Sequence, residues 1–239
     1  MDPSTWVVRA LNLPEHAINP IHTDAGAQAA GFERALVAGV TTYAYLTHPP
    51  AVAWGEEWLA AGGGEVRFRA PVCVDDEVHC TPTSTGELTM IEALVDGVAR
   101  ATFVAVRDSG SVVAMRDGEA LRSRHVRMEG EFGAEYGMRA GDEFDLYTRL
   151  GLVHPAVWPA FANHLVHAEV ARGSWVHTRS IIRHHSVAHV GDTADIHGVV
   201  VRRFDSRAGE RAVLDVRIEV SGSVVATLEH EAIVALPGF

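Results

Sequence analysis

The sequence predicts an α+β protein in which one unit, a long buried helix followed by antiparallel strands, occurs twice in tandem. Residues 35–55 and 150–168 are the longest stretches without a charged residue, and each is long enough for a helix that is covered on nearly all sides. A shift of 116 residues aligns 66–71 with 182–187, which places a similar strand after each helix. The two halves therefore have the same predicted order of elements.

In the first half, the helix begins near Gly39. We expect a break at Pro49-Pro50, because proline lacks the N–H group that an α-helix uses. The three glycines at 62–64 end the helix. The last two predicted strands are joined by Asp96-Gly97, a strong signal for a two-residue hairpin turn. The strands predicted in this half are 65–70, 76–84, 88–95 and 98–107.

In the second half, Pro155 suits the first turn of a helix that runs toward Arg172. The hairpin turn Ser221-Gly222 matches Asp96-Gly97 at a shift of 125, so this half has nine additional residues, which we place in a loop around 205–210. A rival shift of 112 pairs two SGSVVA segments, but it does not pair hairpin turns with each other. The strands predicted in this half are 175–184, 192–203, 211–220 and 223–234.

Glycine and charged residues interrupt any regular pattern between the two halves. We therefore divide the chain into an N-terminal unit, 1–107, a connecting segment, 108–145, and a C-terminal unit, 146–239.

The composition limits the classes of function. Of the 239 residues, 47% are hydrophobic and 21% are charged, which provides a large core and excludes wholesale disorder. The net charge of −11, without a basic run, argues against binding to nucleic acid or an anionic membrane. No secretory signal is visible, so we expect a cytoplasmic location. Two cysteines, Cys73 and Cys80, are too few for a disulfide framework, and the histidine groups lack companion ligands at a metal-binding spacing.

A helix held in a curved antiparallel sheet, repeated in tandem, is typical of a double hotdog fold. The segment from 19 to 42 adds a motif: Asn19-Pro20-Ile21-His22, an Ala-Gly-Phe turn at 30–32, and Gly39-Val40 at the helix start. It resembles the MaoC-like family of (R)-specific enoyl-CoA hydratases and acyl dehydratases, whose signature is Asp-x-Asn-Pro-(Leu/Ile)-His. The resemblance implies two fused hotdogs, of which one is catalytic and the other degenerate. Met138 stands at the position that matches His22, so the second half has no duplicate of the motif.

The resemblance implies that His22 is the catalytic acid/base, that Asn19 positions the reacting groups, and that the Gly39 N–H polarises the thioester carbonyl. Val40 and Tyr43, near the same helix start, are the other expected substrate-binding residues. Addition of water to a double bond conjugated to a thioester builds negative charge on the carbonyl oxygen, and N–H groups at a helix N-terminus stabilise such charge. Histidine titrates near neutrality, which suits the proton transfer.

The sequence departs from the signature at two positions. Ala17 stands where the aspartate is expected, and Ala38 stands where a histidine precedes the helix glycine. The candidates for the missing group are Glu15, His16 and Asp24. Asp24 is the predicted third catalytic residue, because a spacing of two in an extended segment puts its side chain on the same face as that of His22. If Asp24 instead begins the short helix that follows, it is a helix cap.

The sequence thus predicts a hydratase or dehydratase of an acyl thioester. Coenzyme A or carrier-protein phosphopantetheine would be part of the substrate, and no separate cofactor or metal is expected. Two alternatives remain open: a hotdog acyl thioesterase, which shares the carbonyl-binding site, and a non-catalytic acyl-binding hotdog. The expected partner is the small acyl thioester, and the two halves suit a pseudo-dimeric monomer or a homodimer.

Overall fold

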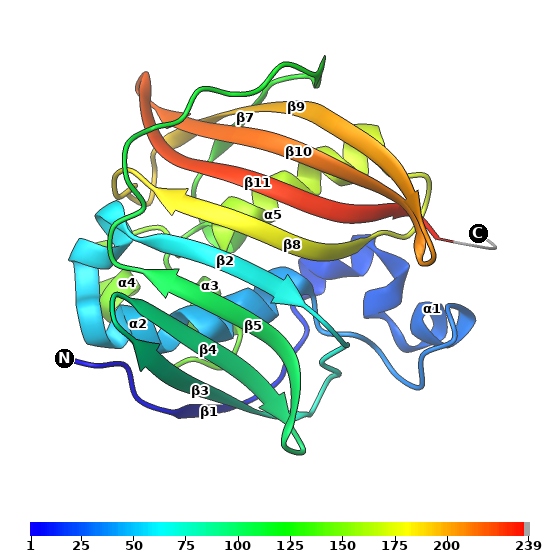
Figure 1. The fold of residues 1–239 in the computed structure, drawn as a ribbon, viewed down its shortest axis with the longest axis horizontal. Coiled ribbons are helices and arrows are strands. Elements are labelled where there is room, and N and C mark those ends of the chain that lie inside the picture. The colour runs from blue at the N-terminus through cyan, green and yellow to red at the C-terminus, as the bar shows by residue number, and fades with distance from the viewer. Residues whose placement is uncertain (237–239) are drawn as a thin grey trace.

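A single antiparallel sheet of eleven strands runs through the computed structural model, which describes residues 1–236, and the long helices lie on one side of the sheet (Figure 1). The strand order is β1-β3-β4-β5-β2-β8-β11-β10-β9-β6, and β7 pairs with β9. Each half contributes four main strands, and their order reverses at the central β2–β8 pair. This arrangement agrees with the predicted tandem repeat.

The strands of the first half are β1 (Trp6–Arg9), β2 (Gly63–Phe68), β3 (Glu77–Thr85), β4 (Leu88–Val95) and β5 (Val98–Val106). Those of the second half are β8 (Val176–His184), β9 (Thr193–Ser206), β10 (Gly209–Val220) and β11 (Ser223–Ala235). The α-helices are α1 (Asp24–Ala29), α2 (Gly39–Ala61), α3 (Tyr136–Arg139), α4 (Leu146–Leu150) and α5 (Val157–Leu165). The other helical turns are η1 (Pro14–Ile18), η2 (Pro20–His22), η3 (Gly130–Phe132) and the π-helical η4 (Val166–Val170).

The two halves meet where β2 and β8 pair along their length, with Val66 opposite Ser180. Gly63 and Gly64 open β2 with φ values of 148° and 153°. A Cβ at either position would lie 2.2 Å from a carbonyl oxygen of a neighbouring strand. Glycine is therefore required for the first residues of β2 to fit between β5 and β8.

Helix α2 does not break at the prolines, which corrects our expectation. It continues through Pro49 and Pro50, and its one non-helical residue is Gly55, with φ 60° and ψ −147°. Glycine adopts a positive φ readily, so the change of direction falls there. Most of α2 before this point is buried, as expected for a helix surrounded by its sheet.

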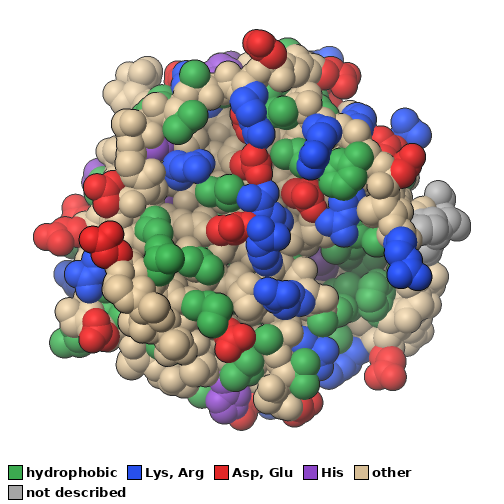
Figure 2. All heavy atoms as spheres, viewed as in Figure 1, with side chains coloured by type: hydrophobic (Ala, Val, Ile, Leu, Met, Phe, Trp, Pro, Cys, Tyr) green, Lys and Arg blue, Asp and Glu red, His purple; other side chains and the backbone are tan. Residues whose placement is uncertain are grey.

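The outer face of the sheet carries charge, and its inner face carries the core. Figure 2 shows arginine and acidic side chains interleaved over this outer face. Arg179 of β8 pairs with Glu65 of β2 and Glu229 of β11, and Arg116 pairs with Asp215 of β10. The alternation of polar and apolar residues along the strands therefore separates solvent from the helices.

The predicted connecting segment also contributes structure. Two short strands within it, β6 (Glu119–Ala120) and β7 (Arg124–Arg127), both pair with β9 and extend the sheet. No helix within residues 1–236 has the length and apolar character needed to cross a bilayer. The last three residues of the predicted 146–239 unit lie outside the described residues.

Candidate active site

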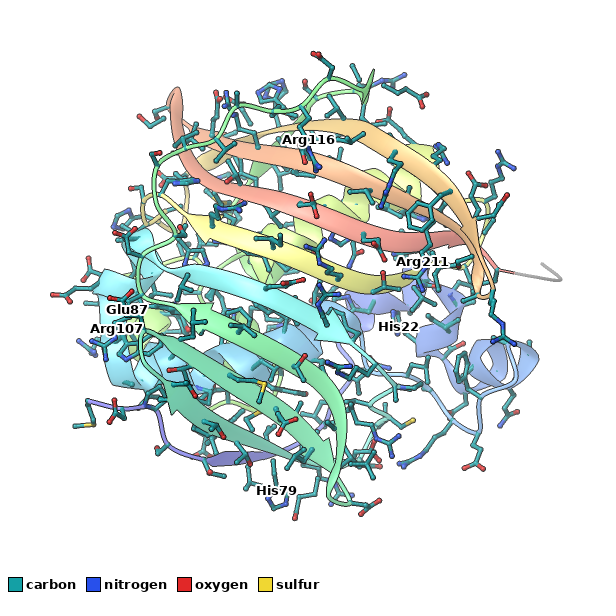
Figure 3. The ribbon with its side chains drawn as sticks, in the orientation of Figure 1. His22, His79, Glu87, Arg107, Arg116 and Arg211 are labelled. Carbon is teal, nitrogen blue, oxygen red and sulfur yellow. The ribbon has the colours of Figure 1, made fainter. Side chains whose placement is uncertain are left out.

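A cavity of about 430 Å³ lies between the two halves of the molecule. Its walls come from the segment before α1, the first turn of α2, the loop after β2, helix α5 and the start of β8. Its polar lining includes His16, Asn19, His22, Asn163, His164 and His177. Figure 3 shows His22 and Arg211, which line the cavity from opposite halves of the chain, at the same end of the molecule.

His22 is held by one edge of its ring. It lies at the end of η2, where its Nδ1–H donates to the backbone oxygen of Leu36 at 2.8 Å. Asn12 fixes the same region, since its Nδ2 donates to the backbone oxygens of both His22 and Leu36. The His22 Nε2 has no partner among the described residues and is not one of their buried unpaired atoms, so it is open to the cavity. Burial lowers the pKa of His22, which leaves Nε2 as a free base near neutral pH.

Asn19 connects the two halves beside His22. Its side chain is 2% exposed, and its Nδ2 donates to the backbone oxygen of Trp175 at 2.8 Å. Its Oδ1 is buried without a partner in the described chain. Asn19 is among the residues that line the cavity, and its acceptor atom is unused.

The first turn of α2 lies at the cavity and has free N–H groups. Gly39 and Val40 both line it, and neither N–H has an acceptor among the described residues. The Ala38 N–H just before the helix is already used, because it donates to Asn12 Oδ1. The first turn of α2 is thus a place where a carbonyl oxygen can accept hydrogen bonds in the favourable field of the helix N-terminus.

His16, not Ala17, turns toward His22. The 3₁₀ turn η1 leaves Ala17 exposed and outside the cavity lining, while the rings of His16 and His22 lie 6.1 Å apart between centroids. The His16 Nε2 lies 3.1 Å from Thr41 Oγ1 and 3.0 Å from the Tyr136 hydroxyl. Burial and the neighbouring His22 lower the pKa of His16 to about 4, so this ring is neutral at physiological pH.

The structure does not bring Asp24 or Tyr43 to the cavity. Asp24 is exposed in the first turn of α1, where its Oδ1 accepts from the Ala35 N–H at 2.9 Å. The cap of α1 is Thr23, whose hydroxyl accepts from the Gly26 N–H. Tyr43 is fully buried and packs edge-on against Phe103 at 5.4 Å, because it lies on the sheet side of α2. Neither side chain is therefore placed at the cavity: Asp24 holds a loop and Tyr43 fills the core.

Three residues of the site were not predicted from the sequence. Tyr136 lies in the connecting segment, which has no recognisable motif, Trp175 lies just before β8, and His177 lies at the start of β8. Each approaches the motif from more than 90 residues away, so no local spacing indicates it. Within residues 1–236, no group of three or more His, Cys, Asp or Glu side chains is arranged to hold a metal ion.

Comparison with known proteins identifies the fold. No family model and no curated protein matches the sequence. Among solved structures, a double hotdog protein of Mycobacterium tuberculosis, described as a conserved hypothetical protein, matches with a TM-score of 0.63 at 10% identity, over 98% of this chain and 96% of that one. A putative MaoC domain protein dehydratase from Chloroflexus aurantiacus matches with a TM-score of 0.61 at 13% identity, over 98% and 95%. A putative thioesterase from Novosphingobium aromaticivorans matches with a TM-score of 0.53 at 14% identity, over 84% and 88%.

The predicted α+β double hotdog fold is therefore confirmed. Dehydratases and thioesterases are both among the structural neighbours of this chain, all at low sequence identity.

Proposed function

We propose that this protein adds water to, or removes it from, an acyl thioester bound in the cavity between its two halves. One observation carries the proposal: His22, whose Nε2 is open, and Gly39 and Val40, whose N–H groups have no acceptor among the described residues, line the same cavity. A base and a carbonyl-binding site side by side are what conjugate addition of water to an enoyl thioester needs.

In the proposed hydration, the thioester oxygen accepts hydrogen bonds from the first N–H groups of α2. His22 Nε2 takes a proton from a water molecule while the water oxygen forms a bond to Cβ of the substrate. The electron pair of the double bond moves toward the carbonyl, and the negative charge collects on its oxygen. His22 then returns the proton to Cα, so the product contains both parts of one water molecule.

His16 serves in this scheme as a neutral group that orients the water. Its low pKa keeps the ring uncharged near neutral pH, so it has no additional proton to give, and its Nδ1 has no partner among the described residues. The Thr41 and Tyr136 hydroxyls fix the other side of the ring. A single base and a neutral orienting ring replace the acid–base pair that the family resemblance implies.

The proposal is tested by offering the purified protein crotonyl-CoA and saturated acyl-CoAs. We expect loss of the absorbance of the conjugated thioester without release of free thiol. Release of thiol from either substrate would instead support a thioesterase. Stabilisation of the fold by acyl-CoA, with neither reaction, would leave only an acyl-binding protein.

A second prediction contrasts the two neighbouring positions 16 and 17. We expect Ala17→Asp to change the hydration rate less than about twofold, because its side chain faces solvent outside the cavity. His16→Gln retains a polar atom where Nε2 contacts Thr41 and Tyr136 but removes Nδ1, so the rate should fall by about tenfold or more. Steady-state rates of both variants decide this. A large gain in Ala17→Asp would show that the carboxylate of the family signature reaches the cavity.

A further inference from the structure

A row of three buried polar side chains ends beside the first residue of α2. His177 and Ser180 lie on β8, and His230 lies on the adjacent β11. The His177 Nε2 is 2.8 Å from Ser180 Oγ, which is 2.9 Å from His230 Nδ1. The two imidazoles lie 4.2 Å apart between centroids, so the three side chains form one compact group in the core.

The cavity end of this row has an unused polar atom. His177 is 6% exposed and lines the cavity, and its Nδ1 is buried without a hydrogen-bond partner in residues 1–236. Buried polar atoms are nearly always paired in folded proteins, so an unpaired one at a cavity wall indicates a place for a ligand atom. Burial and the neighbouring His230 hold the pKa of His177 well below its usual range, so the ring is neutral and carries one proton.

The unpaired nitrogen lies next to Gly39, the first residue of α2. A Cβ built on Gly39 would meet His177 Nδ1 at 3.2 Å and the Cβ and Cγ of the same side chain at 3.4 and 3.5 Å. The imidazole therefore packs directly against the residue whose N–H is free at the start of α2. Glycine at position 39 leaves the room for this contact.

We propose that His177 Nδ1–H is a further hydrogen-bond donor to the carbonyl oxygen of the bound thioester, alongside the N–H groups of Gly39 and Val40. This inference rests on the proposed function, since it concerns the same bound thioester. In the tautomer that it requires, His177 Nε2 accepts from the Ser180 hydroxyl, and Ser180 Oγ accepts from His230 Nδ1–H. Each contact then uses one proton, and the remaining proton of His177 is on Nδ1, next to Gly39.

The test uses a bound chromophore, so that it does not depend on turnover. The absorption of 4-(dimethylamino)cinnamoyl-CoA moves to longer wavelength when its carbonyl accepts hydrogen bonds. We expect this shift on binding to the wild-type protein. His177→Gln places an amide where Nε2 lies and loses the group at Nδ1, so it should bind the probe with a clearly smaller shift and hydrate crotonyl-CoA about 10²-fold more slowly.

His177→Asn supplies the matched comparison, because its shorter amide places an N–H near the position of Nδ1. It should retain most of the wavelength shift. Ser180→Ala removes the hydroxyl that links His177 to His230, so it should reduce the wavelength shift in part. This variant tests the proposal if His177→Gln does not fold. His185→Gln is the control: His185 comes directly after β8 and its ring also contacts a hydroxyl, that of Thr227, but His185 is not part of the cavity lining.

The outcomes separate this inference from the proposed function. An unchanged shift in folded His177→Gln with bound probe would overturn the role of His177, whatever the hydration rate. A red-shifted probe on a wild-type protein that hydrates nothing would contradict the proposed reaction and support the carbonyl site. A wild-type protein that does not bind the probe would contradict both.

Discussion

His22→Asn is expected to lower the rate of hydration by about 10²–10⁴-fold, the usual contribution of a positioned general base. The asparagine amide lies close to where His22 Nδ1 donates to Leu36, so the local backbone keeps its hydrogen bond. The atom that is lost is Nε2, which in the proposed reaction takes the proton from water. A selective loss of turnover with the fold intact is therefore the expected signature of the variant.

The measurement is the steady-state rate with crotonyl-CoA together with the thermal midpoint of unfolding. His79→Asn is the matched control, because His79 lies on the outer part of β3, away from His22 (Figure 3), and pairs with Glu77. Turnover within tenfold of the wild type in His22→Asn would remove His22 from the catalytic role. A similar loss in both variants would point to a general effect of the substitution.

The pH dependence of the hydration rate is an independent test of His22 as the base. Protonated His22 cannot accept a proton, so the rate should fall as the pH falls through the pKa of His22. Burial lowers that pKa below 6.5, so the acid limb of the rate profile should lie below 6.5. A rate that already falls between pH 8 and 7 would indicate a different base.

The fold was predictable from the sequence because its signals are local. The uncharged run 35–55 marks a helix that must be covered, and Asp96-Gly97 and Ser221-Gly222 mark two-residue hairpins. In the structure, the four residues of these two turns all have positive φ. The strand boundaries agree with the predicted ones to within three residues, because the turns fix where the strands can begin and end.

The orientation of the side chains around the motif was harder to predict. A spacing of two from His22 places Asp24 on the same face only if the chain is extended, and the chain instead turns into α1 at that point. In the same way, the 3₁₀ turn η1 rotates His16 inward and Ala17 outward. Short helical turns change which neighbour faces the cavity, and the sequence does not mark them.

The partners of the motif could not be predicted, because the topology brings them together. His16 contacts Tyr136 across 120 residues, and Asn19 contacts Trp175 across 156. These contacts exist only because β2 and β8 pair and place the second half against the motif. The groups that contact the motif thus come from the connecting segment and from the second half, and no local pattern in the sequence predicts them.

The protein is expected to lose its stability between pH 6.5 and 4, because it buries an unusual set of neutral histidines. Burial lowers the pKa of His16 and His184 to about 4 and that of His154 and His230 to about 3, and it holds the pKa of His177 well below the usual value. In the unfolded chain these rings take up protons near pH 6.5. The unfolded state therefore binds more protons as the pH falls below 6.5, and the free energy of unfolding decreases until the folded rings titrate as well.

The size of this effect is comparable to the whole stability of a domain. At pH 5, each such histidine costs about 2 kcal/mol relative to neutral pH, since one pKa unit corresponds to about 1.4 kcal/mol. Five of them together approach ~10 kcal/mol, within the range of total folding free energies. Chemical denaturation monitored by tryptophan fluorescence at a series of pH values should show this loss well above the pH at which most carboxylates titrate.

His184→Asn isolates one member of the set. The His184 Nδ1 donates to the backbone oxygen of Trp58 at 3.1 Å, and an asparagine amide can keep this bond while removing the titrating ring. The slope of unfolding free energy against pH between 6 and 4.5 should then decrease by up to about 1.4 kcal/mol per pH unit, the contribution of one proton. His189→Asn, on an exposed loop, should leave the slope unchanged. Equal slopes in the wild type and His184→Asn would mean that His184 does not remain neutral in the folded protein and that burial does not lower its pKa.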